Sequence, residues 1–298
     1  MKKTNISTLL ELVFTEQQIS RIPINLRNRE VELEEIKNQQ KFIAECDEAS
    51  ENFKIAGEHR KADWEKGWSG QGVFYSEDEY NNLPYYFANN THVRIGGKIY
   101  KDCTGFTELN LLRALQAVVV GDALGRIKVD SLIEYGCGTG SNIQFLKTLY
   151  EKLEFYGADW VQSAIDKLIT NKIVDKKHSV VVNYFDKTTF WAPKLPFIAF
   201  TNASLEQSGT RYKEFINYLI DNKNCAGAVH IEPIRELLDT NIPLNKQSYY
   251  YAEKRGYLNG FYEYLKTQDI NIIQARDYGI GSKFLSGYQV IVWDKSHG

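Results

Sequence analysis

Acidic residues end three short apolar runs between residues 131 and 186 of this 298-residue chain. Glu134 follows Leu132 and Ile133, and two more acids, Asp159 and Asp186, end later runs. An open parallel sheet binds its ligands at the carboxyl ends of its strands, so we expect these acids on one edge. A carboxylate about 20 residues beyond a glycine-rich turn accepts hydrogen bonds from ribose hydroxyl groups, which is the position of Asp159. Asp186 is placed to accept from an adenine amino group.

Proton-transfer candidates follow the next two apolar runs. Glu206 ends the fourth run, and His230 and Glu232 lie in the segment HIEP at the fifth. A histidine titrates near neutral pH, because its reference pKa is about 6.5. A core position for His230 and a helix-capping or substrate-anchoring role for Glu206 remain open alternatives. We take His230, Glu232 and Glu206 as the catalytic candidates that would deprotonate a hydroxyl or amino group.

A glycine-rich stretch at 131–142, SLIEYGCGTGSN, separates the first run from a helical pattern. Glycines permit a tight turn and a close backbone approach to a ligand, and the following helix offers free N–H groups. The spacing G-x-G-x-G differs from the dinucleotide fingerprint, because Ser141 stands where that fingerprint has its third glycine. Glu134 directly before the turn would repel a pyrophosphate. The turn therefore favours a cationic or zwitterionic ligand.

The elements that position these residues alternate between apolar runs and helical patterns, which indicates an α/β sheet covered by helices on both faces. A helix at 106–123 is expected to pack against this sheet. We expect a domain over 106–298 with seven mostly parallel strands, at about 131–135, 154–158, 179–184, 196–201, 226–231, 270–276 and 287–293.

The segment 134–140, EYGCGTG, resembles the first motif of class I S-adenosylmethionine-dependent methyltransferases, and the resemblance extends over 106–298. The phrases GCGTG-x-N, G-x-DW, LEQ, HIEP and RGY are also similar to bacterial methyltransferases of uncertain substrate. The resemblance implies a Rossmann-like sheet ending in an antiparallel hairpin, with S-adenosylmethionine as cofactor and S-adenosylhomocysteine as product. The cofactor-binding residues that it implies are Glu134, Gly136, Cys137, Gly138, Thr139, Gly140, Asn142, Asp159, Trp160, Phe185, Asp186 and Asn202.

Residues 1–105 match no module that we can name, and we expect a helical and aromatic cap. Residues 1–60 are polar and charged in a pattern that favours helices. The stretch 64–87 is rich in tryptophan and tyrosine, as either a small core or a lid over the acceptor, and HVRIGGKIY predicts a hairpin. Substrate-binding candidates are Trp64, Trp68, Tyr75 and, from the second domain, Arg255, whose planar guanidinium could hold a carboxylate or phosphate.

The composition of the chain narrows the classes of function that the sequence allows. The balance of 36 basic and 38 acidic residues gives no support to a nucleic-acid footprint, although a local basic patch stays open, and neither a nucleic-acid nor a membrane partner is expected. The four cysteines have no metal-site spacing, so we expect reduced thiols, no metal, no signal peptide and a cytoplasmic protein. The Asn/Asp-Pro-Pro-aromatic and Pro-Cys motifs of nucleic-acid methyltransferases are missing.

These observations predict methyl transfer to an oxygen or nitrogen of a small polar metabolite. A sugar, an amino sugar and an amino-acid derivative are the candidate acceptors. The alternatives are an RNA or protein methyltransferase and a non-catalytic protein that binds S-adenosylmethionine. A homodimer is compatible with the sequence, which does not fix the oligomeric state.

Overall fold

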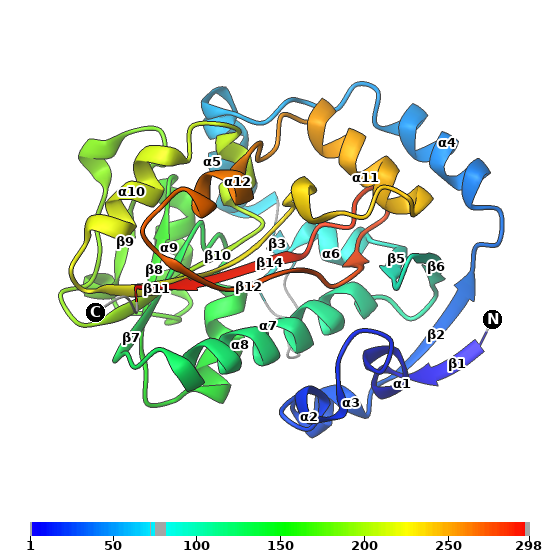
Figure 1. Ribbon diagram of the computed structural model, residues 1–298, viewed down its shortest axis with the longest axis horizontal. Helices are drawn as coiled ribbons and strands as arrows, with labels where there is room; N and C mark the ends of the chain where they lie inside the picture. Colours follow the sequence, from blue (N-terminus) through cyan, green and yellow to red (C-terminus); the bar gives the residue numbers. More distant parts are fainter. Residues whose placement is uncertain (1, 72, 75–81, 296–298) are drawn as a thin grey trace.

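The computed structural model describes residues 2–71, 73–74 and 82–295. Seven strands form its main sheet in the order β12-β14-β11-β10-β7-β8-β9 (Figure 1). Adjacent strands from β11 to β9 are parallel, and β14 is antiparallel to both of its neighbours. The strands are β7 (Ser131–Tyr135), β8 (Glu154–Asp159), β9 (Ser179–Val181), β10 (Phe197–Asn202), β11 (Cys225–Glu232), β12 (Asn271–Asp277) and β14 (Gln289–Asp294). The expected seven-stranded, mostly parallel sheet is therefore confirmed, and it is consistent with the methyltransferase fold.

The sheet carries helices on both faces, as its side-chain alternation requires. Leu132 on β7 belongs to one apolar core cluster and Ile133 to another, and Phe155 and Tyr156 on β8 divide in the same way. The first cluster contains side chains of α7 (Thr107–Arg126), α8 (Ser141–Leu149) and α9 (Gln162–Thr170). The second contains side chains of α10 (Lys213–Asp221) and α12 (Phe261–Lys266). Successive side chains along each strand thus pack alternately against the two helical layers.

The strand order reverses beside β7, and this places the site. After β9 the chain crosses over to β10, which pairs with the other side of β7. The loops that follow β7 and β10 therefore separate at the sheet edge and leave a crevice between them. The glycine turn follows β7, and Asn202 ends β10.

The N-terminal region is a mixed structure, and the expectation of a helical 1–60 is wrong in part. Strands β1 (Lys2–Asn5) and β2 (Glu30–Glu35) join β6 (Lys98–Asp102), β5 (His92–Ile95) and β13 (Ile280–Gly281) in an antiparallel sheet. Val31 and Leu33 are buried while Glu30, Glu34 and Glu35 are exposed, a period of two that the acidic composition concealed. The expected 92–100 hairpin is confirmed. Because β13 comes from the second half, the two regions share this sheet, and the division after residue 105 stays a prediction.

Short helices complete the chain, and Figure 1 shows α1, α2 and α3 beside α7. None of the helices among the described residues has the length and apolarity that a bilayer crossing needs. The remaining elements are α1 (Ile6–Leu10), α2 (Glu16–Ile19), α3 (Ile24–Arg27), α4 (Gln39–Ala49), η1 (Glu58–Arg60), α5 (Lys61–Lys66), the π-helical turn η2 (Gly67–Gln71), β3 (Val73–Phe74), β4 (Leu83–Pro84), α6 (Tyr85–Asn89), η3 (Lys176–His178), η4 (Lys187–Thr189), η5 (Leu205–Ser208), η6 (Arg235–Leu237) and α11 (Pro243–Lys254).

Candidate active site

The turn between β7 and α8 requires its glycines. Gly136, Gly138 and Gly140 have φ angles of 76°, 52° and 77°, a region that residues with a Cβ atom rarely adopt. A Cβ atom on Gly136 would lie 2.2 Å from the Cβ of Ser204, and one on Gly140 would lie 2.3 Å from a methyl group of Leu168. The backbone of this turn can therefore approach its neighbours and a ligand in a way that no other residue type allows.

Glu134 lies beneath this turn and is completely buried. Its Oε1 accepts a hydrogen bond of 2.7 Å from Asn142 Nδ2, and its Oε2 has no partner among the described residues. Burial raises the pKa of the Glu134 carboxyl to about 8, although the bond from Asn142 acts in the opposite direction. An ionised Glu134 would therefore leave a negative oxygen unpaired behind the turn.

Side-chain amides connect Glu134 to the ends of the neighbouring elements. Gln116 Nε2, on α7, donates to Asn142 Oδ1 at 2.9 Å and to Asn202 Oδ1 at 3.1 Å. Since both oxygens are occupied, the amide orientations of Asn142 and Asn202 are fixed: Asn142 Nδ2 is directed at Glu134, and the Nδ2 of Asn202 stays available as a donor. This chain of amides holds β7, α7, α8 and β10 together at the crevice.

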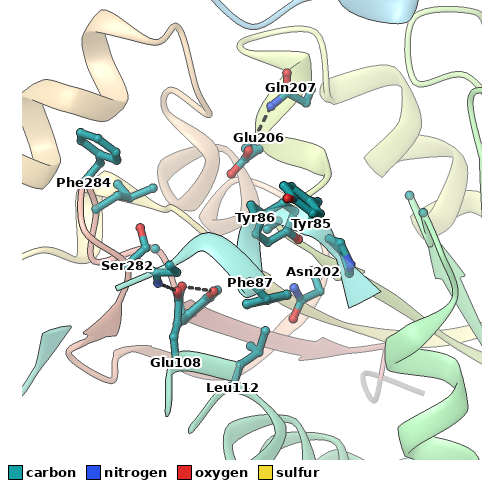
Figure 2. Close-up of a pocket in the computed structure, with 18 of the residues that line it drawn as sticks. Tyr85, Tyr86, Phe87, Glu108, Leu112, Asn202, Glu206, Gln207, Ser282 and Phe284 are labelled. Carbon is teal, nitrogen blue, oxygen red and sulfur yellow. Dashed lines mark hydrogen bonds between the residues drawn. The ribbon is translucent and has the colours of Figure 1, made fainter. Parts of the chain in front are cut away.

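A cavity of about 730 Å³ opens from the glycine turn toward α6 and α11 (Figure 2). Most of the residues that the sequence predicted for the site lie on its wall. Those on its wall are Gly136, Cys137, Gly138, Thr139, Asn142, Asn202, Glu206, Trp64, Trp68 and Arg255. Gly140, Asp159, Trp160, Phe185, Asp186, His230 and Glu232 are not on the wall, Glu134 lies behind it, and Tyr75 lies outside the described residues.

Asp159 is tied to the glycine turn instead of facing the cavity. Its Oδ2 accepts from the backbone N–H of Gly138 at 2.9 Å, and its Oδ1 accepts from that of Val161 at 3.2 Å. Burial raises its pKa to about 6 against the effect of these N–H groups. The indole of Trp68 lies over Gly138, since a Cβ atom there would be 3.1 Å from Trp68 Cζ2. The ribose-binding role of Asp159 stays a prediction.

The expected adenine residues form a separate group beside the cavity. The rings of Trp160 and Phe185 have centroids 5.7 Å apart, and the guanidinium of Arg211 lies 4.8 Å from the Phe185 ring centroid. Asp186 Oδ1 accepts from the backbone N–H of Thr188 at 3.0 Å and from its hydroxyl at 2.7 Å, which lowers the pKa of Asp186. Asp186 thus caps η4, and its binding to adenine stays a prediction.

The structure places His230, which the sequence predicts as a catalytic base, in the core. Trp293 Nε1 donates to His230 Nε2 at 3.0 Å, so Nδ1 carries the proton and donates to Thr201 Oγ1, also at 3.0 Å. The imidazole is completely buried beside Phe261, and burial lowers its pKa to about 3. This neutral ring links β10, β11 and β14 and does not contact the cavity.

Glu232, the second predicted base, bonds to the loop after β10 and is not on the cavity wall. Its carboxylate accepts from the backbone N–H groups of Ser204, Leu205 and Glu206 at 3.1–3.2 Å. Burial, together with the nearby charge of Glu206, raises the pKa of Glu232 to about 8. Glu232 therefore fixes the loop after β10 that carries Glu206.

Glu206 and Arg255 do reach the cavity wall. Gln207 Nε2 donates to Glu206 Oε1 at 3.0 Å, and burial raises the pKa of Glu206 to about 7 while the charge of Arg255 opposes the rise. Arg255 Nη1 donates to the Tyr251 hydroxyl at 3.0 Å, and its guanidinium lies 5.2–5.7 Å from the ring centroids of Phe53, Tyr251 and Tyr257. The catalytic role of Glu206 and the substrate-binding role of Arg255 stay predictions.

The sequence reading missed Glu108, on α7, which also lies on the cavity wall. Asn90 Nδ2 donates to its Oε2, and the Tyr288 hydroxyl donates to its Oε1 at 2.6 Å. Glu108, Leu112 and Gln116 are spaced four residues apart and share one face of a helix that is otherwise apolar. Polar residues on such a face were the signal that could have identified it.

No family model matches this chain, and no curated protein matches it. Among solved structures, it is similar to human N-acetylserotonin methyltransferase in complex with S-adenosylmethionine (16% identity, 63% of this chain and 56% of that chain, TM-score 0.40). It is also similar to an O-methyltransferase family protein from Burkholderia thailandensis (11% identity, 64% and 60%, TM-score 0.42). A third is magnesium protoporphyrin IX methyltransferase from Synechocystis PCC 6803 (11% identity, 63% and 82%, TM-score 0.43). The chain thus spans less than two thirds of the first two, and their activities are not extended to it.

Proposed function

We propose that this protein is an S-adenosylmethionine-dependent methyltransferase that acts on a small polar molecule. The observation that carries the proposal is Glu134, a buried carboxyl with one unpartnered oxygen beneath a glycine turn at the sheet's switch point. A buried charge is stable only when it is paired. The cationic methionine end of S-adenosylmethionine would supply the missing partner.

The residues around the turn fit this cofactor. The hydroxyl of Thr139 is also buried on the cavity wall without a partner among the described residues, and it could bond to a carboxylate of the same ligand. Gly136 and Gly138 provide the close backbone approach. Asn142 and Asn202 would orient the ligand through amides that Gln116 already fixes.

When bound, S-adenosylmethionine supplies a methyl group that its sulfonium has already activated, so the protein's contribution is largely alignment. The loop that Glu232 fixes places Glu206 on the wall, where its carboxyl, with a pKa of about 7, can accept a proton from the acceptor. The cavity's volume, about 730 Å³, falls within the range typical of small-molecule sites. A cavity of this volume supports a small acceptor.

The test uses S-adenosylmethionine labelled in its methyl group, incubated with the protein and, separately, with small-molecule, RNA and protein fractions of cells. Label in the small-molecule fraction is the expected result and identifies the acceptor. Label in RNA or protein alone would refute the small-acceptor part. Absence of S-adenosylhomocysteine binding by calorimetry would refute the cofactor assignment itself.

A further inference from the structure

The cavity wall that α6, α7 and the loop before β14 supply is aromatic and acidic. Figure 2 shows Glu108 and Glu206 entering the cavity from different sides, with Tyr86 between them. Tyr86 has an exposed fraction of 54% because it faces this space, whereas Phe87 and Tyr288 are buried in the wall. The charges of Glu108, Glu206 and Glu134 all raise the pKa of the Tyr86 hydroxyl, after burial as the main cause. Carboxyl groups thus surround the Tyr86 hydroxyl in this part of the cavity.

Glu108 is a carboxyl without a cation. It is 6% exposed, and its two oxygens accept only from neutral groups, the Asn90 amide and the Tyr288 hydroxyl. No ion pair involves Glu108 within the described part of the chain. Burial raises the pKa of Glu108 to about 7, although the bonds from Tyr288 and Asn90 lower it, and these neutral donors do not balance the charge of the ionised form. Each oxygen also keeps a lone pair for a further donor.

Among the described residues, no cationic side chain on the cavity wall is paired with Glu108, and Arg60 bonds instead to Asp63. Arg94 donates to the carbonyl groups of Leu244, Ser282 and Lys283, and to side chains of α11. Arg255 bonds to Tyr251 and influences Glu206 rather than Glu108. The Lys283 ammonium lies 5.3 Å from the Phe284 ring centroid. The chain itself therefore leaves the charge of Glu108 for a ligand to match.

We propose that the acceptor is a small amine with an apolar or aromatic body, whose ammonium group is bound by Glu108 while its body packs on Tyr86 and Phe87. Aromatic faces attract cations and bury apolar groups, so the same rings serve both parts of such a molecule. This inference rests on the proposed function, because it identifies the acceptor class of that site. The amine is the group that Glu108 binds. The methyl group could be transferred to the nitrogen of the amine or to another atom of the same molecule.

The test compares two probes of the same shape, 2-phenylethylamine and 2-phenylethanol, which differ in a charged and a neutral terminal group. Their affinities are measured by calorimetry in the presence of S-adenosylhomocysteine. A charge-assisted bond to a buried carboxylate should favour the amine by about ten- to hundredfold in the wild type. Glu108→Gln keeps the shape and the neutral partners but removes the charge, so the preference should fall to about onefold. Glu108→Asp should restore part of it.

The ratio of the two affinities guards against a folding defect, because a misfolded variant loses both probes alike, and thermal melting confirms the fold. Equal affinities in the wild type, including no detectable binding of either probe, would overturn the proposal. A preference that survives in Glu108→Gln would also overturn it. Binding of S-adenosylhomocysteine alone is measured separately. If that binding is absent while the amine preference holds, the proposed function fails and the amine site stands.

Discussion

Replacing Glu134 by glutamine should raise the free energy of unfolding and weaken cofactor binding. The carboxyl has a pKa of about 8 in the folded protein, against 4.5 without burial. At pH 7 the unfolded chain has lost this proton and the folded chain mostly keeps it, which costs the folded state about 3 kcal/mol. Glutamine is neutral and keeps an oxygen for Asn142, so it removes that cost. Its new NH₂ group lacks an acceptor, which offsets part of the gain.

The pH dependence isolates the titration of Glu134. Because the folded pKa lies above the unfolded one, wild-type stability falls as pH rises from about 4.5 to about 8, and it is unaffected by this group below that window. The unpaired glutamine amide is a constant penalty and cancels between two pH values. The stability of Glu134→Gln relative to wild type should therefore rise by about 2 kcal/mol from pH 5 to pH 7 in urea unfolding. Equal differences at the two pH values would refute the reasoning.

Cofactor affinity should move the other way. Loss of a charge-assisted bond to the methionine ammonium should weaken S-adenosylhomocysteine binding by about ten- to hundredfold in calorimetry at pH 8. Glu108→Gln is the matched control, since it neutralises another buried carboxyl that we place against the acceptor, and its S-adenosylhomocysteine affinity should stay within about twofold of wild type. A Glu134→Gln protein that binds like wild type would exclude Glu134 as the anchor, however stable it proved.

Three further substitutions test the surroundings. Gly138→Val should abolish S-adenosylhomocysteine binding in calorimetry, because φ is 52° and even a Cβ atom would lie 3.1 Å from Trp68; tight binding would contradict the turn's role. Trp68→Ala should remove most of the fluorescence change that S-adenosylhomocysteine causes, and an undiminished change would place the responding indole elsewhere. His230→Gln should leave turnover near wild type. The free energy of unfolding of this variant, relative to wild type, should also rise by about 2 kcal/mol when the pH falls from 7 to 5, because below about pH 6.5 only the unfolded histidine takes up a proton. A difference that does not change with pH would contradict a buried neutral ring.

The sequence predicted the parts of the fold that residue type alone controls. The apolar runs predicted where the seven strands of the main sheet lie along the chain, and the positive φ angles of the turn leave glycine as the natural residue at 136, 138 and 140. It did not predict β2, because six residues that include four glutamates suggested a helix while burial follows their alternation. The outcome depends on distant parts of the chain, because β6 pairs with β2 while Val31 and Leu33 join a core cluster that contains side chains of α1 and β5.

The site was predicted less completely, because the position of a residue at a strand end does not determine the direction of its side chain. His230 and Glu232 are two residues apart on β11, so they share a face with Ala228, whose side chain belongs to the core cluster on the α10 side. This parity could have weakened His230 as a candidate, but only the loop after β10 explains why Glu232 is needed. Glu108 lies on a helix that its leucines and valines mark as packing, and its exposure to the cavity depends on α6 and β14.

The buried carboxyl groups differ in the partners that compensate their charge. Asp159 and Glu232 accept from backbone N–H groups, partners that folding itself provides, and they hold the turn after β7 and the loop after β10. Glu134 keeps an unpaired oxygen, and Glu108 has only neutral donors. Burial without charge compensation destabilises the folded chain, and a bound cation would return that free energy as affinity. We therefore propose these two carboxyls, one beneath the turn behind the cavity wall and one on the aromatic wall, as the positions that bind two separate cations.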